Sequence, residues 1–358
     1  MPPQALRILT LDGAGLKGLS ELFILQHLFV RVKELTGLRD IQPCDVFDIL
    51  AGSSTGGLNA ILLGRMVLST TESILAYTTI GEKVFALPKD DEAHTSKTRR
   101  FLRKLASGPQ QSRTQDLMES MMGVLSDTRD VAARFSVDDK IQDQEYFDDH
   151  SWRVMLSVTR KGRSNDEPEI LRNWHSDVPG ERNYTLCVWE AAGAVCAEPT
   201  WFSETVRLEQ SGDRLYAAAK DRANPINDML EEMHKDKTLT GHDIACLVSI
   251  GAGKVQPDGI VSESVSAVAE ILSTAEETAE NFAGTPTGVE LKKAGKYFRF
   301  NLPLDAEELA MDECTEVDKV KDEVNKYTNQ AAIKEMMEQC AQCLAMTVRI
   351  SSGRVKGS

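Results

Sequence analysis

The chain has 358 residues, of which 41% are hydrophobic and 27% are charged, and its formal net charge at pH 7 is −14. This composition is typical of a globular protein with a large core, and the acidic balance argues against a nucleic-acid partner, because phosphate groups require a positive surface. No stretch approaches the roughly 20 apolar residues of a membrane span. The first residues also lack an apolar secretory segment, so a cytoplasmic location is expected.

The seven cysteines are odd in number and have no framework spacing, which argues against a disulfide scaffold. Cys340 and Cys343 form a C-x-x-C, but within a helical run and without a second ligand pair, so both are interpreted as helix residues. The short basic runs Lys97–Arg100 and Arg103–Lys104 are interpreted as solvated helix faces that could also touch anionic headgroups.

The first elements in the chain are two strand–turn–helix units. Residues 5–11 predict a buried strand, and residues 20–35 predict a helix from the spacing of their apolar positions. A second apolar run at 46–50 leads through the glycine-rich turn 51–57 into a helical pattern at 58–66. Two such units indicate an α/β fold with a mostly parallel sheet.

Residues 67–150 are polar and helical, without a strand signal, and residues 351–358 are expected to be a frayed tail. The rest of the chain predicts three strands and two helical regions. The strands are expected at 153–158, 186–189 and 244–250, an amphipathic helix at 260–282, and acidic helices at 305–346.

The segment Gly52-Ser53-Ser54-Thr55-Gly56 has the pattern G-x-S-x-G and lies between a predicted strand and a predicted helix. A serine on such a tight turn is exposed, and small flanking residues prevent clashes with neighbouring chain. Ser54 is the serine framed by two glycines, so it is the candidate nucleophile. The alternative is a helix-capping serine in a glycine-rich turn.

A second glycine-rich turn, Gly13 to Gly18, has the spacing G-x-G-x-x-G. This spacing fits a dinucleotide pyrophosphate site, which also needs an acidic residue about 20 residues later, after a second strand. Glu34 and Asp40 follow a long helix instead, which weakens that interpretation. The loop also fits an oxyanion hole, in which backbone N–H groups stabilise charge formed during acyl transfer.

The combination of Leu11–Ser20 with Asp48–Gly57 resembles the patatin-like phospholipase family. The family's glycine loop reads D-G-G-G-x-[RK]-G, and Ala14 replaces one glycine here while keeping its N–H group. Further segments resemble the fungal-type members. These are Val188–Ala192, Cys196–Phe202, Leu247–Lys254 and Tyr297–Asn301.

The resemblance runs from about residue 6 to about residue 345. It implies one patatin domain over residues 1–350, with a three-layer α/β fold, a mostly parallel central sheet and helices on both faces. Residues 67–150 would then be a helical insertion that covers the acyl site.

The family uses a Ser–Asp dyad, whose serine matches Ser54. Its aspartate lies a few residues before an Asn-Pro pair, here Asn224-Pro225, and the family spacing puts Ala217 in the aspartate's place. This alanine is either a natural loss of the base or an introduced replacement, and the engineered case is slightly favoured because Ser54 and the glycine loop are intact.

Two nearby acids are poor replacements for the missing aspartate. Asp213 lies four residues before Ala217, roughly 13 Å away along an extended strand, and Asp221 would need an unusual loop. The histidines are expected to be structural or exposed, and His175 is the best histidine candidate for a base. They are His27, His94, His150, His175, His234 and His242.

The resemblance therefore implies a serine acyl hydrolase of lipid esters, of the phospholipase A type, impaired at the base position. Its oxyanion hole would be formed by Gly13, Ala14, Gly15 and Gly18, and no metal or organic cofactor is expected. The expected partner is a lipid or another acyl ester, with contact to a membrane surface and none to nucleic acid. Two alternatives stay open: an acyltransferase or cyclising enzyme of specialised metabolism, and a catalytically silent module that binds acyl ligands.

Overall fold

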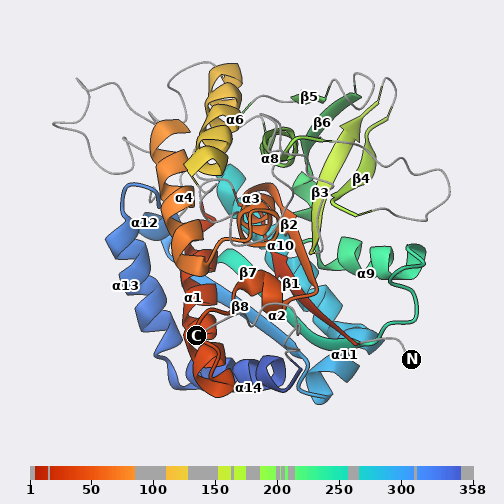
Figure 1. Cartoon of the computed structure of the whole chain (residues 1–358), viewed down its shortest axis with the longest axis vertical. Coiled ribbons are helices and arrows are strands. Elements are labelled where there is room, and N and C mark those ends of the chain that lie inside the picture. Colours follow the sequence, from red (N-terminus) through yellow and green to blue (C-terminus); the bar gives the residue numbers. More distant parts are fainter. Residues whose placement is uncertain are drawn as a thin grey trace, which may run out of the picture.

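The computed structural model is built on one eight-stranded sheet surrounded by helices (Figure 1). It describes residues 5–14, 17–84, 110–127, 152–162, 165–174, 186–198, 202, 206–208, 214–256, 266–309 and 313–347. The strands are β1 (Leu6–Leu11), β2 (Ile49–Ser53), β3 (Arg153–Lys161), β4 (Glu167–Arg172), β5 (Val206–Leu208), β6 (Arg214–Ala218), β7 (Ile244–Val255) and β8 (Tyr297–Leu304).

Helices connect these strands and follow the last of them. They are α1 (Leu19–Thr36), α2 (Pro43–Val46), α3 (Ser54–Ala60), α4 (Thr70–Val84), α6 (Gln110–Asp127), α8 (Val188–Cys196), α9 (Ile226–Lys235), α10 (Ser266–Gly284), α11 (Pro286–Lys293), α12 (Ala306–Leu309), α13 (Val317–Thr328) and α14 (Ala331–Thr347), with a π-helical turn η1 (Ile61–Arg65) and a 3-10 turn η4 (Lys220–Arg222).

The centre of the sheet is parallel, in the order β3-β2-β1-β7-β8. The strands β4 and β6 pair antiparallel with β3, and β5 pairs antiparallel with β6. This architecture confirms the predicted α/β fold. Because β1 and β2 are parallel neighbours, the turns that follow them leave the same edge of the sheet.

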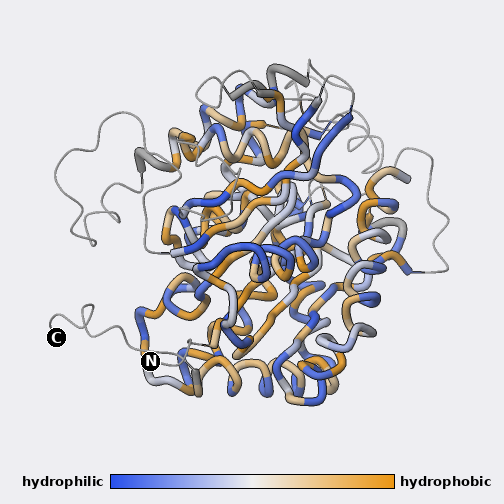
Figure 2. Tube along the Cα trace, turned by 90° about the vertical axis from the view of Figure 1, so that its right-hand side faces the viewer, coloured by the Kyte–Doolittle hydropathy of each residue, from blue (hydrophilic) through white to orange (hydrophobic). Residues whose placement is uncertain are grey.

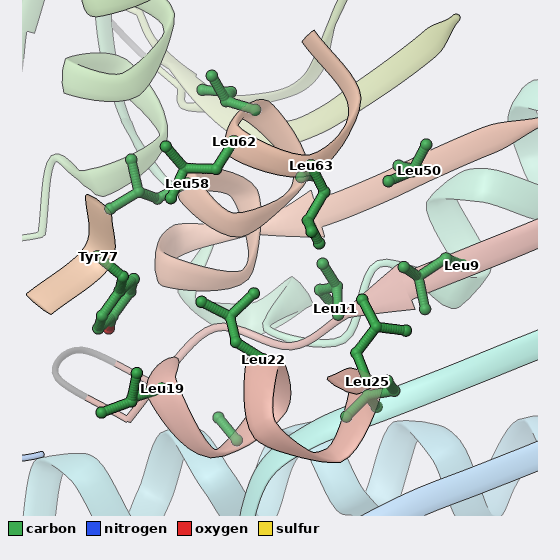
Figure 3. Close-up of a cluster of buried hydrophobic side chains, with 14 of the residues drawn as sticks. Leu9, Leu11, Leu19, Leu22, Leu25, Leu50, Leu58, Leu62, Leu63 and Tyr77 are labelled. Atoms are coloured by element: carbon green, nitrogen blue, oxygen red, sulfur yellow. The ribbon is translucent and has the colours of Figure 1, made fainter. Parts of the chain in front are cut away.

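Apolar residues alternate between the two faces of the sheet, as the two-residue period of a strand requires. Leu9 and Leu11 of β1 join the core beneath α1, α3 and α4, whereas Leu6 and Ile8 join the core beneath α9 and α11. Figure 3 shows the first cluster, in which side chains of α1 and α3 meet those of β1 and β2. In Figure 2 the surrounding helices alternate hydrophobic and hydrophilic positions along their length.

The predicted strand at 186–189 is wrong. The structure has the helix α8 from Val188, and the Glu190 carboxylate accepts the Cys187 N–H at 2.8 Å, so the first turn is capped by its own acid. A short apolar run does not distinguish a strand from a buried helix, and the alanines that follow favour the helix.

Two other boundaries also differ from the prediction. The apolar run 46–50 spans the end of α2 and the start of β2, so the strand reaches Ser53 instead of ending at Leu50. The helix predicted at 58–66 begins at Ser54, directly after that strand. Both differences place the predicted nucleophile on the strand-to-helix junction itself.

The region 67–150 contains two described helices, α4 and α6. The helix α4 packs against α1 and α6, and α6 packs against α8. Residues 85–109, 128–151 and 348–358 lie outside the described residues, including both basic runs and the expected tail. Of the helices that the structure describes, none combines the length and hydropathy of a membrane-crossing segment.

Candidate active site

Ser54 lies in a left-handed turn where β2 passes into α3. Its φ is 47°, a conformation that is rare for a residue with a side chain and that clusters at functional sites. The side chain of Ser54 is half-buried, whereas Ser53 is buried and its Oγ has no hydrogen-bond partner. The structure thus presents Ser54 rather than Ser53 as the accessible hydroxyl of this turn.

The glycines on either side of Ser54 are required by close backbone contacts. A Cβ on Gly52 would lie 2.3 Å from the carbonyl oxygen of Gly56, and a Cβ on Gly56 would lie 2.3 Å from that of Leu11. The turn therefore folds tightly on itself and packs against the end of β1. This is the physical reason for the G-x-S-x-G pattern at this position.

The glycine loop after β1 begins in direct contact with the serine turn. A Cβ on Gly13 would lie 2.6 Å from Ser54 Cβ, and the Ala14 N–H donates to Thr55 Oγ1 at 3.3 Å. The Gly13 N–H donates to the Ala223 carbonyl at 2.8 Å. Both amides thus have protein acceptors here, so a role for either in oxyanion binding requires that the substrate oxygen replace that acceptor. Gly15 lies outside the described residues.

Gly18 closes the loop at the other end, where α1 begins. Its N–H donates to the Tyr77 hydroxyl at 3.1 Å, and its carbonyl accepts from Asn59 Nδ2 at 2.8 Å. The first amides of α1, Leu19 N–H and Ser20 N–H, both donate to Glu313 Oε2. A dinucleotide would need this helix terminus for its pyrophosphate. Since a buried carboxylate of the protein occupies it, the geometry argues further against the dinucleotide interpretation.

Ala217 lies near the end of β6, close to the serine turn. The register pairs Ser53 with Ser157, and Ala217 with Thr159, which lies two residues further along β3. The strand β4 pairs with one edge of β3 over residues 155–160. The strand β6 must therefore pair with the opposite edge, which β2 occupies as far as Ser157. Ala217 and Ser53 are therefore separated by roughly 7 Å along β3, at about 3.3 Å per residue. Ala217 is buried and offers a methyl group at this place.

Of the three alternative bases, one lies within the described residues. Asp221 is exposed in η4, while Asp213 and His175 lie outside the described residues. Of the other histidines, His27 in α1 pairs with Asn325 of α13. His94 and His150 also lie outside the described residues.

The sequence did not point to two carboxylates that the fold brings near Ala217. Asp228 accepts from Ser157 Oγ at 2.5 Å and forms an ion pair with Arg222 at 2.6 Å. Ser157 is the residue that pairs with Ser53 in the sheet. The early position of Asp228 in α9 gave no sign of this contact.

The second carboxylate is Glu198, which is buried and forms an ion pair with Lys220. It follows Ala197, whose carbonyl accepts the Ala218 N–H at 2.7 Å. Both carboxylates near Ala217 therefore have cationic partners.

The Cys196 thiol also lies at the site and donates to the Ser54 carbonyl at 3.8 Å. Burial raises the pKa of the Cys196 thiol to about 12, so the thiol stays protonated near neutral pH. Within the described part of the chain, no three His, Cys, Asp or Glu side chains are grouped as a metal site.

Asp12, immediately before the glycine loop, is tied into a buried charge network. Its Oδ2 accepts from Arg299 Nη2 at 2.6 Å, and the same nitrogen donates to Glu276 Oε2 at 3.0 Å. Burial raises the pKa of Asp12 to about 6, and the charge of Arg299 opposes that rise. Arg299 lies in the segment Tyr297–Asn301, for which the sequence offered a resemblance but no role.

Curated relatives share parts of this chain. It is 40% identical over 95 residues to phospholipase A I of Arabidopsis thaliana, covering 26% of this chain and 7% of that protein. It is 33% identical over 124 residues to patatin-like protein 1 of Arabidopsis thaliana, covering 32% and 29% of the two chains. It is 26% identical over 336 residues to calcium-independent phospholipase A2-gamma of Oryctolagus cuniculus, covering 90% and 38%. The chain thus spans well under half the length of these curated relatives.

Among solved structures, VipD from Legionella pneumophila aligns with a TM-score of 0.39 and 11% sequence identity, over 90% of this chain and 67% of that one. The sequence profile described as "Patatin-like phospholipase" matches residues 9–217, which is more than half of the chain and includes both glycine-rich turns and the serine. The chain belongs to the patatin-like phospholipase family.

Proposed function

We propose that this chain is a serine acyl hydrolase that acts on lipid acyl esters, with Ser54 as its nucleophile. The observation that carries the proposal is the left-handed conformation of Ser54 on a strand-to-helix turn, with Gly13 packed against its Cβ. Strain of this kind is maintained only where the surrounding structure enforces it.

In the proposed reaction, Ser54 Oγ attacks the ester carbonyl and its proton leaves with the alcohol. Amides of the glycine loop stabilise the oxyanion, and water then cleaves the acyl–Ser54 ester to release the fatty acid and restore the hydroxyl. The reaction uses no metal and no organic cofactor.

The aspartate of the family dyad would accept the serine proton during attack, and we propose that Ala217 takes its place. The register supports this assignment, because it brings the end of β6 to the serine turn. Without a base, Ser54 retains only the rate that positioning and the oxyanion donors supply. The chain is therefore a slow hydrolase.

The helices α4 and α6 form the proposed cover of the acyl chain, within a single domain over residues 1–350. Tyr77 of α4 touches Gly18 of the glycine loop, and α6 packs against α8, whose last residue touches Ser54. The segment Val188–Phe202, which contains α8, also supports a fungal-type member of the family. A lipid surface is the proposed source of substrate.

A catalytically silent acyl-ligand binding module is the second candidate. Two observations favour it: the methyl side chain at Ala217, and the protein acceptors that hold the Gly13 and Ala14 amides.

Intact-protein mass spectrometry after incubation with a fluorophosphonate tests the two candidates. A single adduct that the Ser54→Ala variant lacks supports the hydrolase. No adduct, together with a rise of the melting temperature on addition of fatty acid, supports the binding module.

A further inference from the structure

The helix α1 starts without a side-chain cap of its own. Its N-cap residue is Gly18, and the N–H groups of Leu19 and Ser20 donate instead to Glu313 Oε2, at 2.8 and 3.3 Å. Glu313 is 1% exposed and lies between α12 and α13, almost 300 residues later in the chain. Free amides of a first helical turn attract negative charge, so this carboxylate serves as a remote cap.

The same end of the glycine loop is held by hydrogen bonds to three other places. The Tyr77 hydroxyl of α4 and the Asn59 amide of α3 bind the two backbone groups of Gly18. The buried Lys17 ammonium donates to the Glu308 carbonyl at 2.5 Å. The loop end is thus fixed to the helices around the serine turn and to the chain beside Glu313.

The position of Glu313 is itself fixed by packing. The next residue is Cys314, and a Cβ on Gly81 of α4 would lie 2.1 Å from its sulfur. An aspartate would be shorter by one carbon–carbon bond, about 1.5 Å, and would not reach both amides. The length of the glutamate side chain therefore matches its place.

We propose that Glu313 is a positioning residue for the glycine loop, and that it sets the loop amides against Ser54 from outside the family-matched residues 9–217. This inference rests on the proposed function, because the loop is proposed to stabilise the oxyanion at Ser54. A carboxylate bonded to backbone N–H groups forms charge-assisted hydrogen bonds, which are stronger than neutral ones. Without this carboxylate, the end of the loop is held only by the hydrogen bonds of Gly18 and Lys17, and it becomes less rigid.

The amides at the opposite end of the loop provide an independent readout. The Gly13 N–H donates to Ala223 and the Ala14 N–H donates to Thr55, so neither touches Glu313. If Glu313 only caps α1, its removal changes Leu19 and Ser20 alone. If it positions the loop, Gly13 and Ala14 also lose protection.

The experiment measures residue-resolved hydrogen exchange and the rate of fluorophosphonate labelling at Ser54 in the full chain. The variants are Glu313→Ala and the conservative Glu313→Gln. The control is Glu323→Gln, which removes a carboxylate of α13 whose partner is the exposed Lys326. We expect exchange at Leu19 and Ser20 to rise about tenfold or more in Glu313→Ala, and exchange at Gly13 and Ala14 to rise about threefold or more.

We expect the labelling rate to fall about tenfold in Glu313→Ala and to be partly recovered in Glu313→Gln, since the amide oxygen still accepts hydrogen bonds. Faster exchange confined to Leu19 and Ser20 overturns the positioning role, and so does a labelling rate in Glu313→Ala equal to that of a parent chain that does label. If Ser54 is unreactive in every form while Gly13 and Ala14 respond, the hydrolase proposal fails and the positioning role stands. Should Glu313→Ala not fold, the same criteria apply to Glu313→Gln.

Discussion

At the scale of single residues, the two adjacent serines of the turn are in different environments. Ser54 is half-buried with a φ of 47°, and Ser53 is buried with an unpartnered hydroxyl. We expect Ser54→Ala to abolish fluorophosphonate labelling, since the nucleophile is removed. We expect Ser53→Ala to keep most of it without loss of stability, because that hydroxyl makes no hydrogen bond. Equal losses in the two variants would show that Ser54 is not the nucleophile.

Ala217 and Ala218 are neighbours on β6 and point to opposite faces of the strand. We expect Ala217→Asp to raise ester hydrolysis by about 10²–10⁴-fold, the usual effect of a positioned general base. The matched control is Ala218→Asp, which adds the same charge at a similarly buried position on the other face. Both variants and the parent chain would be assayed on a chromogenic fatty-acyl ester and on mixed phospholipid. Recovery in Ala218→Asp alone would refute the assignment of the dyad position.

At the scale of the elements, the site depends on two turns that leave neighbouring strands side by side. A Cβ on Gly13 would lie 2.6 Å from Ser54 Cβ and 2.7 Å from the Ser53 carbonyl oxygen, so one turn must move. We expect Gly13→Ala to lower the labelling rate of Ser54 by about 10²-fold, comparable to the loss of one oxyanion donor.

The control for this prediction is Gly123→Ala in α6, where an added Cβ meets no atom within 4 Å. Alanine is the better helix former, so this variant should keep its labelling rate and gain about 0.5–1 kcal/mol of stability. A Gly13→Ala variant that labels like the parent would show that the contact between the turns does not set the reactivity of Ser54.

The elements also show where sequence patterns are informative. The strand at 5–11 and the helix at 20–35 were predicted almost to the residue, because each has a clear apolar period. The strand β6 gave no such signal, since three alanines fit any structure. Its place in the sheet depends on pairing with β3, which lies more than 50 residues earlier.

At the scale of the whole molecule, Arg299 joins distant parts of the chain. It contacts Asp12 after β1, Ser249 in β7 and Glu276 in α10. Removal of one partner would leave a buried charge uncompensated, which typically destabilises a protein by about 3–5 kcal/mol. The start of the glycine loop is therefore fixed by residues that lie far beyond it in sequence.

This network predicts a pH dependence of stability. The folded pKa of Asp12 is about 6 and its ordinary value is 3.8, so the folded protein keeps a proton that the unfolded chain releases. The Asp12 contribution to the free energy of unfolding therefore falls as pH rises from about 4 to about 6. Glu276 opposes this trend, because the charge of Arg299 helps to lower its pKa despite burial.

Urea unfolding of the parent chain and of Asp12→Asn at pH 4.5 and 6.5 isolates the Asp12 contribution. We expect the parent to lose stability relative to the variant between these values, by roughly 2 kcal/mol, because most of the effect of a pKa shift from 3.8 to about 6 falls within this window. The opposite sign would show that the ion pair with Arg299 outweighs the burial of Asp12.

The amino-acid pattern was enough to predict the α/β fold, the family and the two turns that define the candidate site. These features are local: glycine spacing and apolar periods are dictated by backbone sterics and by burial of the nearest face. The choice of Ser54 over Ser53 was already predicted from the glycines that frame Ser54. The packing of distant elements, which the sequence did not predict, places Glu313 and Arg299 at the two ends of the glycine loop. The same packing brings Asp228 and Glu198, each with a cationic partner, near Ala217. The contacts of Glu313 with Leu19, of Arg299 with Asp12 and of Asp228 with Ser157 join residues 294, 287 and 71 positions apart. The distance between such residues is set by how the sheet and helices pack, which no local pattern encodes.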